Sequence, residues 1–329
     1  MKLSSFRDGS LDGSLLLVSK NLERAVRCDD VAPNLRSALE TWEQSEGPLR
    51  NRAEALERDQ LEGVFPFDPR ATLAPLPRAP QFLDGSTYKS HGDLVAASHG
   101  TTMPAGAYTT RPVMYQGTSD DLLGAYDDIA LPSEDEEIDF EAEVAAFTGA
   151  VPMGISAEAA NAKVRLIGVM NDVSLRKICP VEVAAGFGLL QGKPRSSFAP
   201  IAVTLDELGD AWRDGRVHLR MQTFWNDELF GTPDAGEMCF SFGDLIAFAA
   251  QRRTLGAGTI VGSGTVSNHA YATVGSGCIA ERRTIENLEF GRPKTGYVRF
   301  GDRIRIALID ADGAKVCGGM DQRVVQFQA

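Results

Sequence analysis

Acidic and apolar residues alternate in the stretch IDFEAEVAAF, residues 138–147. Asp139, Glu141 and Glu143 occupy every second position, and apolar side chains fill the places between them. Because successive side chains of a β-strand point to opposite faces, this pattern predicts a strand that carries all three carboxylates on one face. Like charges at this spacing repel one another unless water or a cation separates them. The pattern therefore leaves two interpretations open, a solvated face or a cation site.

Short apolar runs punctuated by Gly, Asn and Asp predict that strands dominate the rest of the chain after residue 80. The runs with the clearest pattern are residues 165–175, 217–226, 258–267 and 302–310. Ala-Asp-Gly at 311–313 follows the last run and indicates a hairpin turn. Helices are expected after Ser156, after Thr204, where TLDE matches a capping box, and over GDLIAFAAQRR, residues 243–253.

The first part of the chain has a different pattern. Residues 14–30 predict two short strands and a turn, and residues 34–63 carry apolar positions at roughly helical spacing. Pro48 is expected to break this helical segment in two. Five prolines between residues 66 and 80 then predict an extended connection. We therefore expect a small N-terminal domain over residues 1–75, followed over residues 76–329 by an α+β, β-dominated domain, a mixed β-roll or barrel.

Charge and cysteine content narrow the classes of function. With 33 basic and 45 acidic residues, the 329-residue chain has a net charge of −12, which argues against nucleic acid or an anionic membrane as the main partner. Its five cysteines are scattered and form no CxxC pair, so free thiols in a reducing compartment are expected. No signal-peptide core follows the N-terminus, and no apolar run of about 18 residues occurs. A cytoplasmic protein is expected.

Further carboxylates favour the cation site over the solvated face. The uncharged segment VAAFTGAV follows Glu143, so the strand is expected to enter the interior. A second isolated acid, Asp172, ends the apolar run LIGVM. Carboxylates that converge from two strands supply the hard oxygen ligands that Mg²⁺ or Ca²⁺ prefers. Asp84 and His91 lie upstream in DGSTYKSHGD, where a helix is expected to begin near His91.

The glycine-rich stretch GAGTIVGSGTVSN, residues 256–268, resembles a dinucleotide-binding loop only loosely. Its spacing is GxGxxxG, and the residues that follow the first glycines predict a strand where a dinucleotide-binding loop requires a helix. Tight turns and a close approach of the backbone to neighbouring groups are expected here.

Six motifs in a fixed order resemble those of the fumarylacetoacetate hydrolase family. They are Asp84-x6-His91, PVMYQG (112–117), Glu-Ala-Glu (141–143), MNDVSLR (170–176), QGKPRSSFAP (191–200), and GSGTVS (262–267) with Glu281 downstream. A small domain before a β-roll is also typical of the longer, fumarylacetoacetase-like members. The resemblance spans residues 84–281 and implies a fumarylacetoacetase-like fold.

The resemblance implies a role for each matching residue. It implies that a divalent cation binds to Asp84, Glu141, Glu143 and Asp172, with Mg²⁺ expected first and Mn²⁺ or Ca²⁺ as alternatives. His91 matches the general base, Glu281 its orienting carboxylate, Lys193 and Arg176 the polar groups near the leaving group and the polarised oxygen, and Tyr115 and Thr265 the substrate contacts. Asp139 matches no ligand and is expected to face solvent. A homodimer is implied as well.

The activity implied is hydrolysis of a carbon–carbon bond in a 1,3-diketo acid of the fumarylacetoacetate or acylpyruvate type, as in the catabolism of aromatic compounds. A decarboxylase, hydratase or isomerase of a related 2-oxo acid is the alternative within the family, and the His91–Glu281 pair favours hydrolysis because decarboxylation needs no attacking water. Cys179 departs from the family pattern, because fumarylacetoacetase has Gln there. A non-catalytic binding module with a solvated acidic strand is the alternative outside it.

Overall fold

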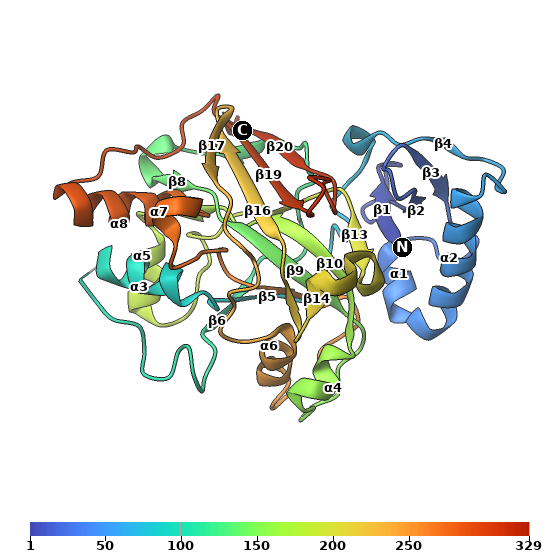
Figure 1. Ribbon diagram of the computed structural model, residues 1–329, viewed down its shortest axis with the longest axis horizontal. Helices are drawn as coiled ribbons and strands as arrows, with labels where there is room; N and C mark the ends of the chain where they lie inside the picture. Colours follow the sequence, from blue (N-terminus) through green and yellow to red (C-terminus); the bar gives the residue numbers. More distant parts are fainter. Residues whose placement is uncertain (99, 329) are drawn as a thin grey trace.

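The computed structural model describes residues 1–98 and 100–328. Its N-terminal segment, blue in Figure 1, is a short antiparallel meander covered by two helices. The elements are β1 (Lys2–Phe6), β2 (Ser14–Val18), β3 (Arg24–Arg27), α1 (Leu35–Glu40), α2 (Trp42–Glu57) and β4 (Phe65–Pro66). The apolar positions that predicted the helices, among them Leu39, Trp42 and Leu49, are buried against β1 and β2. This hydrophobic contact is what holds the two helices on the sheet.

The helical segment breaks at Thr41, so the break predicted at Pro48 is wrong. Pro48 lies inside α2, and Thr41 has φ −120° and ψ 36°, outside the helical range. The Thr41 hydroxyl and backbone N–H both donate to the Ser37 carbonyl, at 2.8 and 3.1 Å, and so complete the last turn of α1. A proline removes a single intrahelical donor, and the burial of Trp42 and Leu49 on either side of Pro48 compensates for this loss.

The meander continues into an 11-stranded sheet, because β1 pairs with β13. The sheet runs β4-β3-β2-β1-β13-β10-β9-β18-β5-β6, with β12 beside β10. Its remaining strands are β5 (Phe82–Gly85), β6 (Met114–Gly117), β9 (Ala142–Thr148), β10 (Val164–Asn171), β12 (Ser197–Phe198), β13 (Ala202–Thr204) and β18 (Ile260–Gly262). All neighbours pair antiparallel except β5 and β18. The domain boundary expected near residue 75 stays a prediction.

A second sheet, β17-β16-β19-β20-β7, packs on the first through a shared apolar core. Its strands are β7 (Ile129–Leu131), β16 (Arg220–Trp225), β17 (Glu228–Gly231), β19 (Arg303–Ile309) and β20 (Met320–Gln326). Two short pairs, β8 (Ile138–Asp139) with β11 (Ser174–Leu175) and β14 (Trp212–Arg213) with β15 (Arg216–Val217), complete the strands. Within residues 1–98 and 100–328 both sheets are open, so the β-dominated α+β class is confirmed in its β-roll form and no closed barrel is formed.

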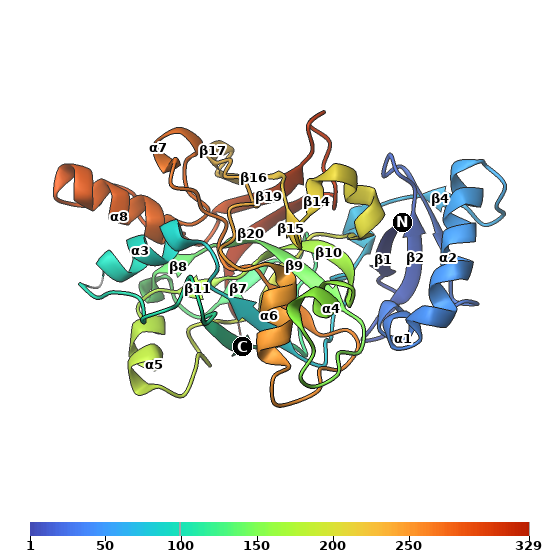
Figure 2. The ribbon, with the colours of Figure 1, turned by 60° about the horizontal axis from the view of Figure 1, so that its bottom comes forward.

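Three helices gather at one end of the molecule. Figures 1 and 2 place α3 (Lys89–Ser98), α5 (Cys179–Ala185) and α8 (Ile279–Phe290) at the end opposite the N-terminal segment. The other helices are α4 (Ala157–Asn161), α6 (Phe242–Ala249), α7 (Tyr271–Val274) and the 3₁₀ turns η1 (Pro69–Ala71), η2 (Glu134–Glu136) and η3 (Leu205–Ala211). Among the helices of the described residues, none is long and apolar enough to cross a bilayer.

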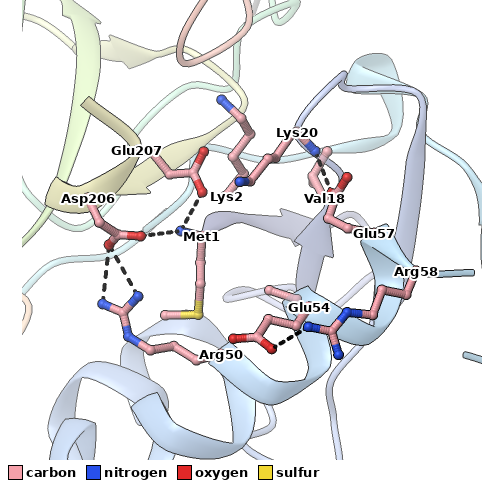
Figure 3. A pocket seen from close by; sticks show the side chains of 11 residues that line it. Met1, Lys2, Val18, Lys20, Arg50, Glu54, Glu57, Arg58, Asp206 and Glu207 are labelled. Carbon is pink, nitrogen blue, oxygen red and sulfur yellow. Dashed lines mark hydrogen bonds and ion pairs between the residues drawn. The ribbon is translucent and has the colours of Figure 1, made fainter. Parts of the chain in front are cut away.

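The capping box predicted at Thr204 is wrong, although a helical segment does follow it. This segment is the 3₁₀ helix η3, and the Thr204 side chain makes no capping bond. The Thr204 hydroxyl and the Glu207 carboxylate instead accept hydrogen bonds from the Met1 amine, as Figure 3 shows for Glu207. A capping box does occur at α6, where Ser241 and Asp244 exchange bonds with each other's backbone. The helix expected over residues 243–253 is therefore confirmed, beginning at Phe242.

Candidate active site

Three carboxylates from neighbouring strands converge at one point. Asp84 lies on β5, Glu143 on β9, and Asp172 directly after β10. One oxygen from each lies within 4.8 Å of the others. Between β5 and β9 runs β18, whose Gly262 pairs with Asp84. A Cβ at Gly262 would overlap the Asp84 carboxylate and lie 3.1 Å from Glu143 Oε2, so the missing side chain is what lets these two acids meet. The close backbone approach predicted from the glycine-rich stretch is confirmed.

The three acids are buried, and Glu143 is the least compensated of them. Gly264 N–H donates to Asp84 at 3.1 Å, but neither oxygen of Glu143 has a hydrogen-bond partner among the described residues. Burial, followed by repulsion from Asp172, raises the pKa of Asp84 to about 7. Burial and the charges of Asp84 and Asp172 raise the pKa of Glu143 well above its usual range. A divalent cation would relieve this repulsion, and an all-oxygen donor set fits Mg²⁺, Mn²⁺ or Ca²⁺.

Glu141, the fourth predicted ligand, lies beside this cluster and is bound by two cations. Lys193 Nζ lies 2.6 Å from Glu141 Oε2, and Arg176 Nη2 lies 2.6 Å from Glu141 Oε1. Burial alone would raise the pKa of Glu141, but Lys193 and Arg176 hold it well below its ordinary value. Lys193 also contacts Asp172 Oδ2 at 2.5 Å and so links Glu141 to the three-carboxylate cluster. A ligand role for Glu141 stays a prediction.

Asp139 is fully buried, so the prediction that it faces solvent is wrong. Its carboxylate accepts hydrogen bonds from Ile279 N at 2.7 Å and Ala280 N at 2.9 Å, at the first turn of α8. It also binds Arg176 Nε at 2.8 Å. The residue at the N-cap of α8, Cys278, makes no capping bond, and Asp139 therefore satisfies the free N–H groups from outside the helix. Asp139 thus fixes both α8 and Arg176.

Replacing Asp139 by Ala is expected to lower the free energy of unfolding by roughly 3 kcal/mol, because Arg176 loses one of its two buried partners and α8 loses its cap. Urea denaturation followed by circular dichroism measures the change. Asp135→Ala, at an exposed acid of the same segment, is the matched control, with an expected change within about 0.5 kcal/mol. Equal stability of the two variants would contradict the structural role of Asp139.

His91 and Glu281 form a hydrogen-bonded pair beside the acids. His91 lies in the first turn of α3 and Glu281 in that of α8, and the two helices contact each other. His91 Nδ1 lies 3.0 Å from Glu281 Oε1, and Glu281 is 1% exposed. His91 Nε2 lies 3.9 Å from Glu141 Oε1, and the ring lines the cavity. When Nδ1–H donates to Glu281, the lone pair of Nε2 remains free to accept a proton.

The remaining predicted residues, Tyr115 and Thr265, line the same cavity. Tyr115 donates its hydroxyl hydrogen to Asp172 Oδ2 at 2.6 Å. The Thr265 hydroxyl is buried and has no partner in the described part of the chain. The sequence reasoning missed Ser196, whose hydroxyl donates to Asp172 Oδ1 at 2.8 Å. Ser196 belongs to the quoted motif QGKPRSSFAP, so its place in that motif was the available signal.

The cavity has a volume of about 650 Å³, and most of the predicted residues line it. Of the predicted residues, Asp172 and Glu281 do not line the cavity. Asp172 is hydrogen-bonded to Tyr115 and Glu281 to His91, and both of these partners line it. A separate hollow, drawn in Figure 3, lies between α2 and η3 and contains none of the predicted residues. Its Arg50 pairs with Asp206 at 3.2 Å and its Glu54 with Arg58 at 3.4 Å. We therefore place the candidate active site at the acidic cavity.

Protein-family models and known proteins match most of the chain. The family model for the fumarylacetoacetate hydrolase C-terminal domain matches residues 81–325, and that for the fumarylacetoacetase N-terminal domain 2 matches residues 1–78. Oxaloacetate tautomerase Fahd2a, mitochondrial, of Rattus norvegicus is 29% identical over 215 residues, 63% of each chain. Oxaloacetate tautomerase FAHD2B, mitochondrial, of Bos taurus is 28% identical over 274 residues, 80% of this chain and 81% of that protein.

Among solved structures, maleylpyruvate hydrolase from Sphingobium sp. SYK-6, in complex with manganese(II) and pyruvate, is similar over the whole length of both chains. The TM-score is 0.67 at 19% sequence identity, which supports the fold alone. The two family models together cover nearly the whole sequence, and the resemblance inferred from the six motifs is confirmed. The chain belongs to the fumarylacetoacetate hydrolase family.

Proposed function

We propose that the protein is a metal-dependent hydrolase that cleaves the carbon–carbon bond of an acylpyruvate-type 2,4-dioxo acid. The observation that carries the proposal is the His91–Glu281 pair. Its Nδ1–Oε1 bond of 3.0 Å leaves Nε2 for other contacts, 3.9 Å from Glu141 Oε1, in a ring that lines the cavity. An imidazole that a carboxylate holds in one orientation is suited to act as a general base toward water.

Asp84, Glu143 and Asp172 would hold the cation, with Glu141 adjacent. The partnerless oxygens of Glu143 support this assignment, because a buried carboxylate without a partner is costly. A divalent cation supplies a Lewis acid that draws electron density from the carbonyl oxygens of the substrate. The manganese(II) in the similar maleylpyruvate hydrolase also supports a divalent ion, and Mg²⁺, Mn²⁺ and Ca²⁺ remain candidates.

The side chains of the protein then have defined tasks. His91 Nε2 takes a proton from water, and the water oxygen forms a bond to the acyl carbonyl carbon. Glu281 keeps the proton on Nδ1 before the step and stabilises the imidazolium after it. Lys193 and Arg176, which both line the cavity and contact Glu141, stabilise the negative oxygen that forms.

The bond between the acyl carbon and the adjacent methylene carbon then breaks. Its electron pair goes to the methylene carbon, which becomes part of the enolate of pyruvate. The imidazolium of His91 returns the proton to that carbon. The products are a carboxylic acid and pyruvate, and one water is consumed.

Tautomerisation of oxaloacetate is the second candidate, because the matched relatives from Rattus norvegicus and Bos taurus carry that name. His91 would serve this reaction as well, by moving a proton between carbon and oxygen without consuming water. The two candidates therefore share the base and differ in whether a carbon–carbon bond is broken.

A comparison of two substrates separates these candidates. Purified protein with 1 equivalent or more of Mn²⁺ or Mg²⁺ is given acetylpyruvate and, separately, the enol form of oxaloacetate, and products are followed by proton NMR. We expect acetate and pyruvate from acetylpyruvate, and loss of this activity with a chelator. Intact acetylpyruvate together with rapid ketonisation of oxaloacetate would overturn the hydrolase in favour of the tautomerase.

The homodimer and the cytoplasmic location expected from the sequence are kept as proposals, as is a role in the catabolism of aromatic compounds. Light scattering after gel filtration tests the dimer. Fractionation of cells tests the location, and the relatives named above are mitochondrial proteins, so an organelle fraction is the comparison to include.

A further inference from the structure

Two groups of residues with different chemistry line the active-site cavity. The first group, called the acid end below, comprises the acids, His91, Arg176 and Lys193, and ion pairs and close polar contacts join its members. The second group, called the apolar end, comes from α3 after His91, the segment 101–104, and α5 with the loop that follows it. Its apolar residues include Val95, Met103, Pro104, Pro180, Val183 and Leu189. The cavity, about 650 Å³, has room for a tail beyond a three-carbon pyruvyl unit.

The positive charges of the cavity all lie at the acid end and already have partners. Arg176 binds Asp139 and Glu141, and Lys193 binds Glu141 and Asp172. Among the described residues that line the apolar end, none carries a charge. A carboxylate placed there would meet no positive partner from the protein.

The polar groups near the apolar end do not replace such a partner. Thr101 and Thr102 offer hydroxyls but no positive charge. Cys179, at the start of α5, donates its thiol hydrogen to the Gly192 carbonyl at 3.1 Å. It therefore offers no free donor where fumarylacetoacetase has an amide. The wall is neutral and mainly apolar.

We propose that the natural substrate is a 2,4-dioxo acid with a single carboxylate and a neutral, apolar acyl tail, and that dicarboxylic analogues are discriminated against. This inference rests on the proposed hydrolase function and adds the substrate class. The pyruvyl end lies at the acids and the tail along the wall of Val95, Met103 and Val183. Each methylene buried on this wall favours binding by about fourfold, whereas a carboxylate taken there from water loses its hydration without gaining an ion pair.

A pair of substrates that differ in one group tests the inference. Crotonylpyruvate and fumarylpyruvate share the unsaturated acyl chain and differ in a terminal methyl against a terminal carboxylate. With wild-type protein and Mn²⁺, we expect kcat/KM to be at least tenfold higher for crotonylpyruvate. Along acetyl-, butanoyl- and hexanoylpyruvate, we expect kcat/KM to rise about fourfold per added methylene.

A kcat/KM for fumarylpyruvate that equals or exceeds that for crotonylpyruvate would overturn the substrate class and leave the hydrolase function standing. Absence of hydrolysis of every 2,4-dioxo acid would overturn the hydrolase function itself.

A variant with a cation on the wall gives an independent test. Val183 lines the cavity and is 64% exposed, so Val183→Lys can place its ammonium group at the cavity while its stem stays on the helix surface. Val181, 68% exposed on the same helix, does not line the cavity, which makes Val181→Lys the matched control. We expect the ratio of kcat/KM for fumarylpyruvate to that for crotonylpyruvate to rise at least tenfold in Val183→Lys and to stay unchanged in Val181→Lys. Equal ratios in the two variants would overturn the inference.

Discussion

Replacing Glu143 by Gln is expected to abolish binding of the divalent cation and to lower kcat by several orders of magnitude. Glu143 is fully buried between Asp84 and Asp172, and its oxygens have no partner among the described residues. Gln keeps the size of the side chain but removes one of the negative charges that a cation needs. Binding is measured by calorimetric titration with Mn²⁺, and kcat with acetylpyruvate.

The same substitution is expected to have the opposite effect on the metal-free protein. Like charges in a buried cluster destabilise the fold, so the chelator-treated Glu143→Gln protein should melt at the same temperature as the wild type or higher. Added Mn²⁺ should stabilise the wild type by mass action, by about 2.7 kcal/mol at a concentration of 100 times Kd, and leave the variant unchanged. An unchanged or higher melting temperature without metal, together with the loss of stabilisation by Mn²⁺, distinguishes a metal ligand from a residue that only supports the fold.

The exposed Asp135, upstream in the same acidic run, provides the control for Glu143. Asp135→Asn should keep the Mn²⁺ titration, the thermal shift and kcat of the wild type. If Glu143→Gln behaved in the same way, the three-carboxylate cluster would not be the metal site. A solvated, non-catalytic role for the acidic strand predicts no thermal shift even for the wild type.

The position of the acids could be predicted only in part from alternation along the chain. Alternation placed Asp139, Glu141 and Glu143 on one face, but the strand is interrupted, since β8 ends at Asp139 and β9 begins at Ala142. The three carboxylates consequently differ in their surroundings, although Arg176 binds both Asp139 and Glu141. Glu143 faces Asp84, Glu141 faces Lys193, and Asp139 caps α8. Such partners come from residues far along the chain, and a local pattern does not contain them.

The order of the six motifs predicted which distant residues meet at the site, which the alternation of acidic and apolar residues could not do. Asp84 lies on β5, which pairs with β18, the neighbour of β9, and Asp172 directly follows β10, which pairs with β9 itself. The motifs that contain these two acids therefore predicted correctly that they lie beside Glu143. Glu281 was identified in the same way, although 190 residues separate it from His91. The break at Thr41 and the lost cap at Thr204 were not predicted. The Thr204 hydroxyl bonds to the Met1 amine, 203 residues away in sequence, and Trp42 beside the break is buried in the core of the N-terminal segment. Propensity and capping patterns describe neighbours in sequence, and these contacts are tertiary.

Replacing His91 by Asn is expected to lower kcat by about 10²–10⁴-fold, the usual contribution of a general base, while Mn²⁺ still binds. The Asn amide can donate to Glu281 in place of Nδ1–H, so the buried carboxylate keeps a partner and the fold is preserved. What the amide cannot do is accept a proton at the position of Nε2. The expected signature is therefore a large fall in kcat with little change in KM and in the Mn²⁺ titration.

His269→Asn is the matched control, because His269 is exposed and lies outside the cavity. It should keep wild-type kinetics. Glu281→Gln addresses the second member of the pair. The Gln carbonyl oxygen can still accept from Gly277 N–H, and the proposed mechanism uses Glu281 through His91, so the loss should be smaller than that of His91→Asn. The double variant should then be no slower than His91→Asn alone, because residues that act as a unit are not additive. Additive losses, or normal turnover by His91→Asn, would show that a different group takes the proton from water.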